Sequence, residues 1–165
     1  MSTKGAQPKR QKEARRASRL AAVQAIYQME LTGADAETVA DEFVAHRFSA
    51  SENEKPDEAL FADIVRGVPH WQAQIDRAIR ECLASGWRMS RVDSIVRAIL
   101  RAAGFELLGR KDIPAKVILD EYVDISHAFF AGEEPSFVNA ALDKIARHER
   151  PQEFGLKPRD DAASF

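Results

Sequence analysis

The sequence has almost no cysteine and no long apolar run, and each shortage excludes a class of protein. The single cysteine, Cys82, rules out an intramolecular disulfide and a cysteine-rich zinc site. No stretch approaches the roughly 18 apolar residues that a membrane-spanning helix needs. The residues before Leu20 are charged and lack the apolar block of a secretion signal, so we expect a cytoplasmic protein without a membrane anchor.

Recognisable signatures of catalysis are also missing. No lysine is followed by Ser or Thr, which excludes a phosphate-binding P-loop, and neither GxGxxG nor GxSxG occurs. The four histidines lie far apart in the sequence, and none forms an HExxH motif. Cys82 falls in a helical pattern, where a small buried hydrophobe is favoured over a reactive thiol. We therefore expect no enzyme, no cofactor and no metal site.

What the sequence does have is a strong separation of charge. The first nineteen residues carry seven Lys or Arg against one Glu, a net +6, whereas the remainder carries 17 against 25, a net −8. The overall charge of −2 therefore hides a polarised molecule. Such asymmetry indicates a polyanionic partner at one end of the chain.

The hydrophobic pattern is helical almost throughout, and all seven prolines suit helix boundaries or a tail. We predict an all-α fold, a compact bundle of about seven helices in two subdomains. Gly33 is expected to end the first helix, and Asp112 and Pro114 to begin the sixth. The predicted helices run from about Lys12 to Leu31, from Ala36 to Phe48, after Pro56, from Pro69 to near Gly86, from Arg91 to Leu108, from Pro114 to Phe129, and after Pro135.

The predicted domain organisation is simple. Residues 1–148 should form one domain, with an N-terminal subdomain over 12–86, a C-terminal subdomain over 87–148 and a basic segment over 1–19. The polar stretch around residues 49–59 reads as a surface loop. Residues 149–165 read as a flexible tail.

The basic segment shares a helical face with apolar residues. Lys12, Arg15, Arg16 and Arg19 follow i, i+3, i+4, i+7 spacing, and the same face continues into Val23, Ile26 and Tyr27. Because a buried stripe cannot hold unpaired charges, the first turns should project from the core or fray. A solubilising basic tail is the alternative, but continuity with a core helix favours binding of an anion.

Two further places could contribute to a nucleic-acid surface. Arg97 and Arg101 lie four residues apart with Phe105 next along the helix, a spacing that suits backbone contact and base stacking, although an ordinary exposed arginine pair is favoured. Phe137 lies at the flank of the last apolar stripe. It is either a core-edge residue or a partly exposed stacking platform, and the pattern leaves both open.

Four segments together resemble the NusB family of transcription antitermination factors. They are ARRASRLAAVQAIYQMELTG, FADIVRGV, IVRAILRAAGFELLGRKDIPAKVILDEYVDIS and FVNAALDKIAR, which cover about Ala14 to Arg147. The resemblance implies an all-α fold with two helical subdomains. It also implies binding of single-stranded boxA RNA in ribosomal RNA leader transcripts, together with the small-subunit ribosomal protein NusE, in antitermination complexes of RNA polymerase.

The resemblance also implies particular RNA-binding residues. The arginine-rich start of the family corresponds to Arg15, Arg16 and Arg19, with Lys9 and Arg10 upstream and Lys12 on the same face. A phosphate-contacting arginine corresponds to Arg101, an acidic residue to Glu133, and aromatics to Tyr27 and Phe137. Pro135 and Ser136 depart from the family, which can place more polar, basic residues there.

Two alternatives stay open beside this reading. A protein-interaction module is favoured by the acidic segment 30–63, which carries ten negative and two positive residues and could dock a basic protein. The same fold also serves as an accessory RNA-binding domain of ribosomal RNA methyltransferases. The sequence does not distinguish a monomer from a homodimer.

Overall fold

The computed structural model describes residues 6–49, 55–83 and 88–158, with the side chains of 6–8 left out. Within these ranges the chain is all-α, as predicted, and contains no strand. The helices are α1 (Ala6–Thr32), α2 (Ala36–Phe43), α3 (Glu58–His70), α4 (Gln72–Cys82), α5 (Ser94–Gly109), α6 (Ala115–Phe129) and α7 (Glu134–Glu149). Shorter helical segments are the π-helical Val44–Phe48 and the 3-10 turns Met89–Arg91 and Pro151–Phe154.

Several helix ends are set by local chemistry that the sequence shows. Gly33 ends α1 with a φ of 72°, a conformation that glycine adopts without strain, and it donates its N–H to the Met29 carbonyl at 2.9 Å. Asp35 begins α2 by accepting the Thr38 N–H at 2.8 Å, and this hydrogen bond lowers the pKa of its carboxyl group. Asp57 and Asp93 cap α3 and α5 in the same way.

One predicted cap is wrong. Asp112 does not cap α6, because its carboxylate pairs with the Arg110 guanidinium, whose Nε lies 3.1 Å from Oδ1. Pro114 occupies the N-cap position of α6 instead. The predicted loop at 49–59 and the predicted helix end near Gly86 lie partly or wholly outside the described residues.

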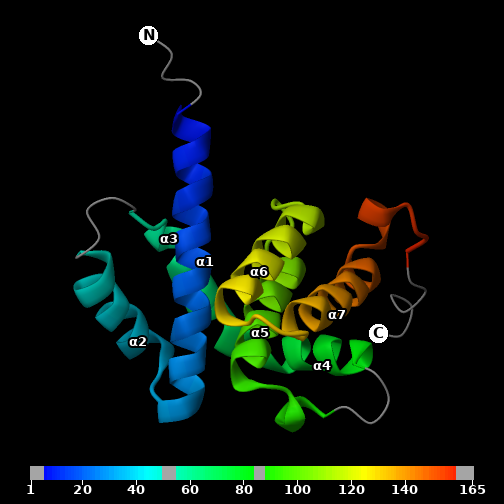
Figure 1. Cartoon of the computed structure of the whole chain (residues 1–165), viewed down its shortest axis with the longest axis horizontal. Coiled ribbons are helices and arrows are strands. Elements are labelled where there is room, and N and C mark those ends of the chain that lie inside the picture. Colours follow the sequence, from blue (N-terminus) through cyan, green and yellow to red (C-terminus); the bar gives the residue numbers. More distant parts are fainter. Residues whose placement is uncertain (1–5, 50–54, 84–87, 159–165) are drawn as a thin grey trace. The chain divides into compact units, whose positions relative to one another are not determined.

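The first of two compact units spans Met1–Gln72. In it α1 packs against α2 and α3, and α2 packs against α3, as Figure 1 shows. The buried residues of this unit include Val23 and Ile26 of α1 and three phenylalanines. The Phe61 ring lies 5.5 Å from that of Phe43 and 4.8 Å from that of Phe48, measured between centroids. Offset and edge-on geometries of this kind add stability beyond burial alone.

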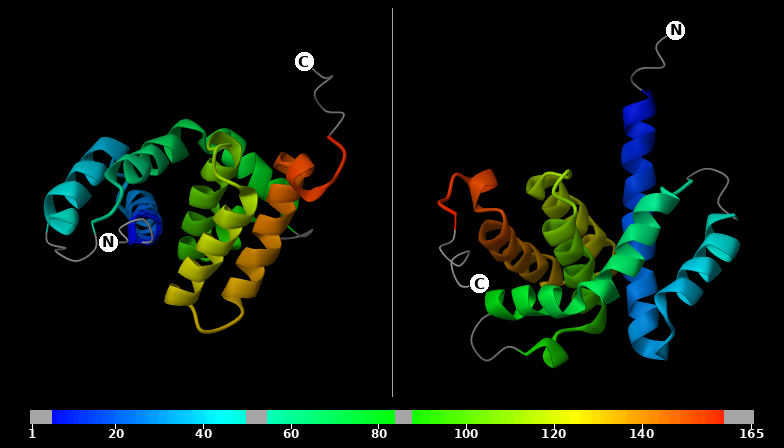
Figure 2. Two further views of the ribbon diagram at one scale, coloured as in Figure 1. Left: turned by 90° about the horizontal axis from the view of Figure 1, so that it is seen from above. Right: turned by 180° about the vertical axis from the view of Figure 1, so that it is seen from behind.

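The second unit spans Ala73–Phe165, and α5 forms its centre. Helices α5, α6 and α7 pack against one another side by side (Figure 2). Nearly every residue of α5 from Val96 to Leu107 is buried, as its wide apolar stripe predicts. Helix α4 approaches α5 at Gly104, where an added Cβ would lie 3.0 Å from the Ile75 Cγ2.

Along the chain the first unit ends at Gln72 and the second begins at Ala73, earlier than the predicted boundary between residues 86 and 87. Helix α4 therefore belongs with α5 to α7. The reason is side-chain contact: Ile75 packs at Gly104, and Asp76 pairs with Arg101. A boundary based on loop composition could not detect these contacts.

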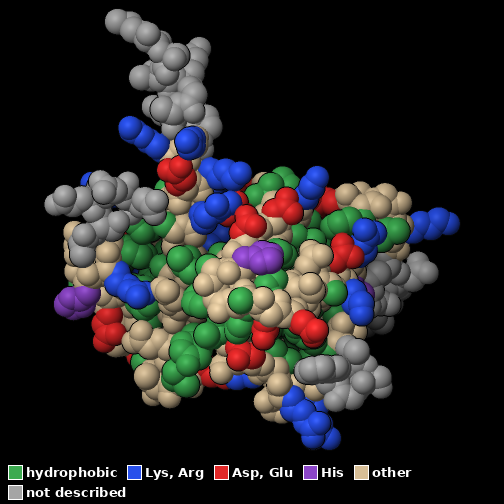
Figure 3. Space-filling model, in the orientation of Figure 1, with side chains coloured by type: hydrophobic (Ala, Val, Ile, Leu, Met, Phe, Trp, Pro, Cys, Tyr) green, Lys and Arg blue, Asp and Glu red, His purple; other side chains and the backbone are tan. Residues whose placement is uncertain are grey.

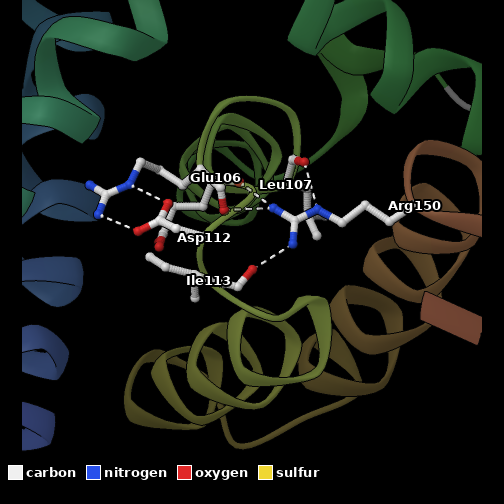
Figure 4. Close-up of polar contacts among 6 residues, drawn as sticks. Glu106, Leu107, Asp112, Ile113 and Arg150 are labelled. Carbon is white, nitrogen blue, oxygen red and sulfur yellow. Dashed lines mark hydrogen bonds and ion pairs between the residues drawn. The ribbon is translucent and has the colours of Figure 1, made fainter. Parts of the chain in front are cut away.

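The segment after α7 is held by a buried arginine, which overturns the prediction of a loose tail from residue 149. Arg150 is 2% exposed and donates to the carbonyls of Glu106 (2.9 Å), Leu107 (2.9 Å), Arg110 (2.8 Å) and Ile113 (Figure 4). It also pairs with Glu153 at 3.2 Å. These oxygens replace the water that the guanidinium loses, so the charge is tolerated in the interior. Residues 159–165 of the predicted tail lie outside the described part.

We predict that Arg150→Met lowers the free energy of unfolding by about 3 kcal/mol, because it removes the guanidinium that donates to four carbonyl groups in the interior. Urea denaturation followed by circular dichroism measures the change. Arg77→Met is the matched control, since Arg77 is an exposed i, i+4 partner of Glu81 and its loss should cost at most about 0.5 kcal/mol. Equal midpoints for the two variants would contradict the structural role of Arg150.

Candidate nucleic-acid interface

The amino-terminal half of α1 leaves the packed core at a definable point. The buried Ser18 hydroxyl donates to the carbonyls of Ala14 (2.9 Å) and Asp57 (2.6 Å), and the Asp57 N–H donates to the Ala14 carbonyl at 3.2 Å. These bonds fix the residue before α3 against α1 at Ala14. In Figure 1 the part of α1 that precedes this point extends beyond α2 and α3.

The cations of this projecting part are exposed to solvent. Lys9, Arg10, Lys12, Arg15 and Arg16 are all in the exposed class, and Figure 3 shows Lys and Arg side chains gathered around this end of α1. Arg16 also has an interaction partner within the structure. One helix therefore combines a buried carboxy-terminal half with a cationic amino-terminal half, which is the arrangement that its wheel predicts.

Arg19 and Tyr27 occupy different environments from these cations. Arg19 is only 2% exposed and has an interaction partner, so the prediction that it is presented to solvent with its neighbours is wrong. It lies one residue after the buried Ser18, on the part of α1 that faces the core. Tyr27 is half-buried.

A second surface, which we call the Phe137 pocket, lies in the second unit. It is a depression of about 340 Å³ that brings Phe137 and Glu133 together with residues from the start of α5. Phe137 is half-exposed, so the structure favours a partly exposed aromatic over a core residue. The remaining lining residues are Arg91, Val92, Asp93, Val96 and Glu134.

Hydrogen bonds to backbone carbonyls hold both walls of the Phe137 pocket. On one wall the Phe137 N–H donates to the Glu133 carbonyl at 3.1 Å, at the first turn of α7. On the other, Arg97 donates to the carbonyls of Met89 and Val92, each at 2.8 Å, and so fixes the turn that carries Arg91 and Val92. The pocket is therefore built in advance of any ligand.

The charge of the Phe137 pocket restricts what it can bind. Its lining contains three carboxylates, those of Asp93, Glu133 and Glu134, and one guanidinium, that of Arg91, and the Asp93 carboxylate also caps α5. A phosphate would be repelled by this excess of negative charge, whereas the N–H donors of a nucleobase would be accepted. The Phe137 ring adds a face on which a base can stack.

The arginines of α5 are engaged within the protein. Arg101 forms a two-bond ion pair with Asp76, at 3.0 and 3.1 Å, and the two side chains are only 14% and 15% exposed. Phe105 is buried. Arg97, Arg101 and Phe105 therefore do not form an exposed stacking strip. Arg101, expected to contact phosphate, is placed by the structure in the contact between α4 and α5.

Sequence reasoning missed Arg91, Asp93, Val96 and Glu134 as neighbours of Phe137. Asp93 falls inside the helix predicted from Arg91 to Leu108, and Glu134 lies just before the helix predicted after Pro135. The start of α5 and the start of α7 are about 40 residues apart in sequence, so no local pattern could pair them.

The described part of the chain offers neither a metal site nor a membrane-spanning helix. Within it, no group of three or more His, Cys, Asp or Glu is placed so that it could hold a metal ion. None of the helices in that part is both long enough and apolar enough to cross a bilayer.

The fold and these surfaces define a class of small helical proteins that present a cationic helix end and an aromatic pocket. A model of the NusB family matches residues 16–147. The chain is 53% identical to the transcription antitermination protein NusB of Maricaulis maris over 144 residues, 85% of this chain and 90% of that protein. It is 51% identical to the NusB of Caulobacter vibrioides over 140 residues, 82% and 94% of the two chains.

A solved structure of the same family also matches this chain. NusB of T. maritima superposes with a TM-score of 0.71 at 31% sequence identity, covering 86% of this chain and 97% of that one. The chain belongs to the NusB family. Its general function is accordingly transcription antitermination, which implies RNA and the transcription machinery as partners, in a family not known for catalysis.

The different burial of two neighbouring arginines on α1 gives a testable distinction. We expect Arg19→Met to lower the free energy of unfolding by about 2 kcal/mol, because it removes a buried, partnered cation. Arg15→Met should change it by at most about 0.5 kcal/mol, because Arg15 is exposed. Thermal unfolding of both variants checks this, and a loss at Arg15 as large as that at Arg19 would show that α1 does not leave the core where the structure places it.

Proposed function

We propose that this chain binds single-stranded boxA RNA of ribosomal RNA transcripts in the cytoplasm, together with NusE, and so supports processive transcription by RNA polymerase. The observation that carries the proposal is the exposed cationic half of α1, projecting from a packed unit in a chain of the NusB family. Clustered Lys and Arg supply the electrostatic part of RNA affinity, because they release counterions from phosphates.

The two surfaces favour a division of roles in RNA binding. The exposed cations from Lys9 to Arg16 suit the phosphates, which carry no sequence information. The Phe137 pocket suits a base, with Phe137 stacking and Glu133 accepting an N–H group. Arg19, Tyr27 and Arg101 are less exposed, and we propose for them a supporting role in which they hold the helices that carry the contacts.

NusE binding is the second element of the proposal. The acidic residues of the first unit support it, because a ribosomal protein that binds RNA is expected to be basic. Glu37 already pairs with Arg66 at 2.7 Å, and Glu42 accepts from Gln28 at 3.4 Å, so part of this charge is used within the unit. If the chain bound only protein, the interaction-module alternative would replace the RNA proposal.

A gel-shift comparison tests the proposed function directly. Labelled boxA-like RNA and a scrambled strand of equal length are titrated with the protein, with and without NusE. We expect a preference for the boxA-like strand that increases when NusE is present. Equal retardation of both strands under all conditions would contradict sequence-selective binding, and no retardation of either would contradict RNA binding altogether.

We predict that Lys12→Ala with Arg15→Ala weakens binding to every RNA sequence and makes the log–log dependence of affinity on salt shallower by about 1.4, since each lost phosphate contact on a single strand contributes about 0.7. Filter binding over a series of salt concentrations measures the slope. Lys111→Ala with Lys116→Ala removes two exposed lysines elsewhere and should leave the slope unchanged. Identical slopes for both double variants would place the phosphate contacts outside α1.

We predict that Phe137→Ala weakens RNA binding by about 1–3 kcal/mol, the value of one stacked base, without unfolding the protein. Trp71→Ala is the control, because Trp71 is a 38% exposed aromatic outside the Phe137 pocket. Affinity and thermal stability are measured for both variants. A Phe137→Ala protein that has lost stability but keeps wild-type affinity would show that the ring serves the core.

A further inference from the structure

A groove at the carboxy-terminal end of α7 lies outside the surfaces to which the proposed function has so far assigned a role. It has a volume of about 530 Å³ and lies between the end of α4, the end of α7 and the segment after Pro151. We call it the α7 groove. Its walls include Cys82 and Leu83 from α4, Lys144 and Arg147 from α7, and Lys157. All of them belong to the second unit.

The α7 groove is cationic, in contrast to the Phe137 pocket. Lys144, Arg147 and Lys157 line it, and Glu81 is the acidic residue in its lining. The Glu81 carboxylate is already engaged, with Arg77 at 3.2 Å and with the His148 ring at 3.7 Å. Lys144 and Lys157 are both exposed, so their ammonium groups can reach a ligand.

Arg147 gives the groove an oriented guanidinium whose charge is partly balanced by Asp143. Its guanidinium pairs with Asp143 at 2.9 Å and lies over the Phe154 ring, 4.8 Å from the ring centroid. These contacts orient the group and lower the entropy that a further hydrogen bond would cost. The two lysines remain adaptable, because an ammonium on a four-carbon chain can follow a phosphate through several positions.

One face of α7 connects the Phe137 pocket with this groove. Phe137, Ala140, Lys144 and Arg147 follow i, i+3, i+7, i+10 spacing, which places them along one side of the helix. With a rise of 1.5 Å per residue, Phe137 and Lys144 are roughly 10 Å apart along the axis. Ala140 is exposed, and its small side chain leaves room for a strand to lie close to the helix between them.

We propose that the α7 groove binds phosphates of the same RNA strand, beyond the nucleotide that stacks on Phe137. This inference rests on the proposed function. No Phe, Tyr or Trp is among the described lining residues, whereas apolar atoms come from Leu83, Pro151 and Leu156. Without an aromatic platform the groove holds the backbone and not a base, so its contribution is independent of sequence.

The test compares RNA strands that do and do not reach the groove. A strand of about four nucleotides occupies one site, whereas strands of about twelve, extended on the 5′ or the 3′ side, can follow α7. Only the long strand that is extended toward the groove should be affected by Lys144→Ala with Lys157→Ala. We expect this variant to bind that strand about fivefold to tenfold more weakly than the wild type does, with a log–log salt slope shallower by about 1.4. The short strand should bind as it does to the wild type. Lys111→Ala with Lys116→Ala is again the matched control.

Cys82 provides an independent readout, because it is the only cysteine in the sequence and lines the groove. A neutral thiol reagent such as N-ethylmaleimide should alkylate it more slowly in the presence of the long strand and at an unchanged rate with the short one. The Lys144→Ala, Lys157→Ala protein should lose this protection. A poly-aspartate peptide is included as the alternative anion.

Three results separate the two proposals. If the wild type binds no RNA, the proposed function is overturned and this inference with it. If the wild type binds the long strand but the lysine variant has the same affinity and slope, only the groove inference is overturned. Protection of Cys82 by the acidic peptide and not by RNA would also overturn it, since the groove would then be a protein-binding site.

Discussion

The constraint that organises this protein is that an arginine or lysine leaves water only where oxygen atoms take the place of water. Arg150 satisfies it with four backbone carbonyls and Glu153, and Arg101 satisfies it with Asp76. Lys12 and Arg15 remain exposed on the projecting part of α1. The same rule therefore decides which cations build the protein and which are offered to a ligand.

This sorting of charge supports the proposal that one small helical fold binds both parts of an RNA strand, the phosphates and the bases. Exposed cations on α1 and in the α7 groove suit phosphates, whereas the acidic, aromatic Phe137 pocket suits the edge and face of a base. Arg97 holds one wall of the pocket by donating to two backbone carbonyls. Structural arginines thus position the surfaces on which the proposed RNA contacts depend.

Much of the fold was predictable because the information is local. The apolar period marks α5 as the central helix, Gly33 marks the end of α1, and the helix predicted over Ala36–Phe48 is present, although its second half is π-helical. The predictions that were wrong concern which partner a polar side chain takes. Asp112 has a cap-like context yet pairs with Arg110, two residues before it. Arg150 resembles a tail residue yet is buried against carbonyls some 40 residues earlier.

The sequence by itself determined the helical class, the polarity of charge and the motifs of the NusB family, because periodicity, composition and short motifs are properties of neighbouring residues. Only the tertiary structure decided that Arg19 is buried while Arg15 is exposed, and that Phe137 shares a pocket with Arg91. Arg15 and Arg19 are four residues apart on α1 and share one helical face, so their spacing does not distinguish them. Their difference comes from tertiary packing, which buries Ser18 and Arg19 and leaves Arg15 and Arg16 exposed to water.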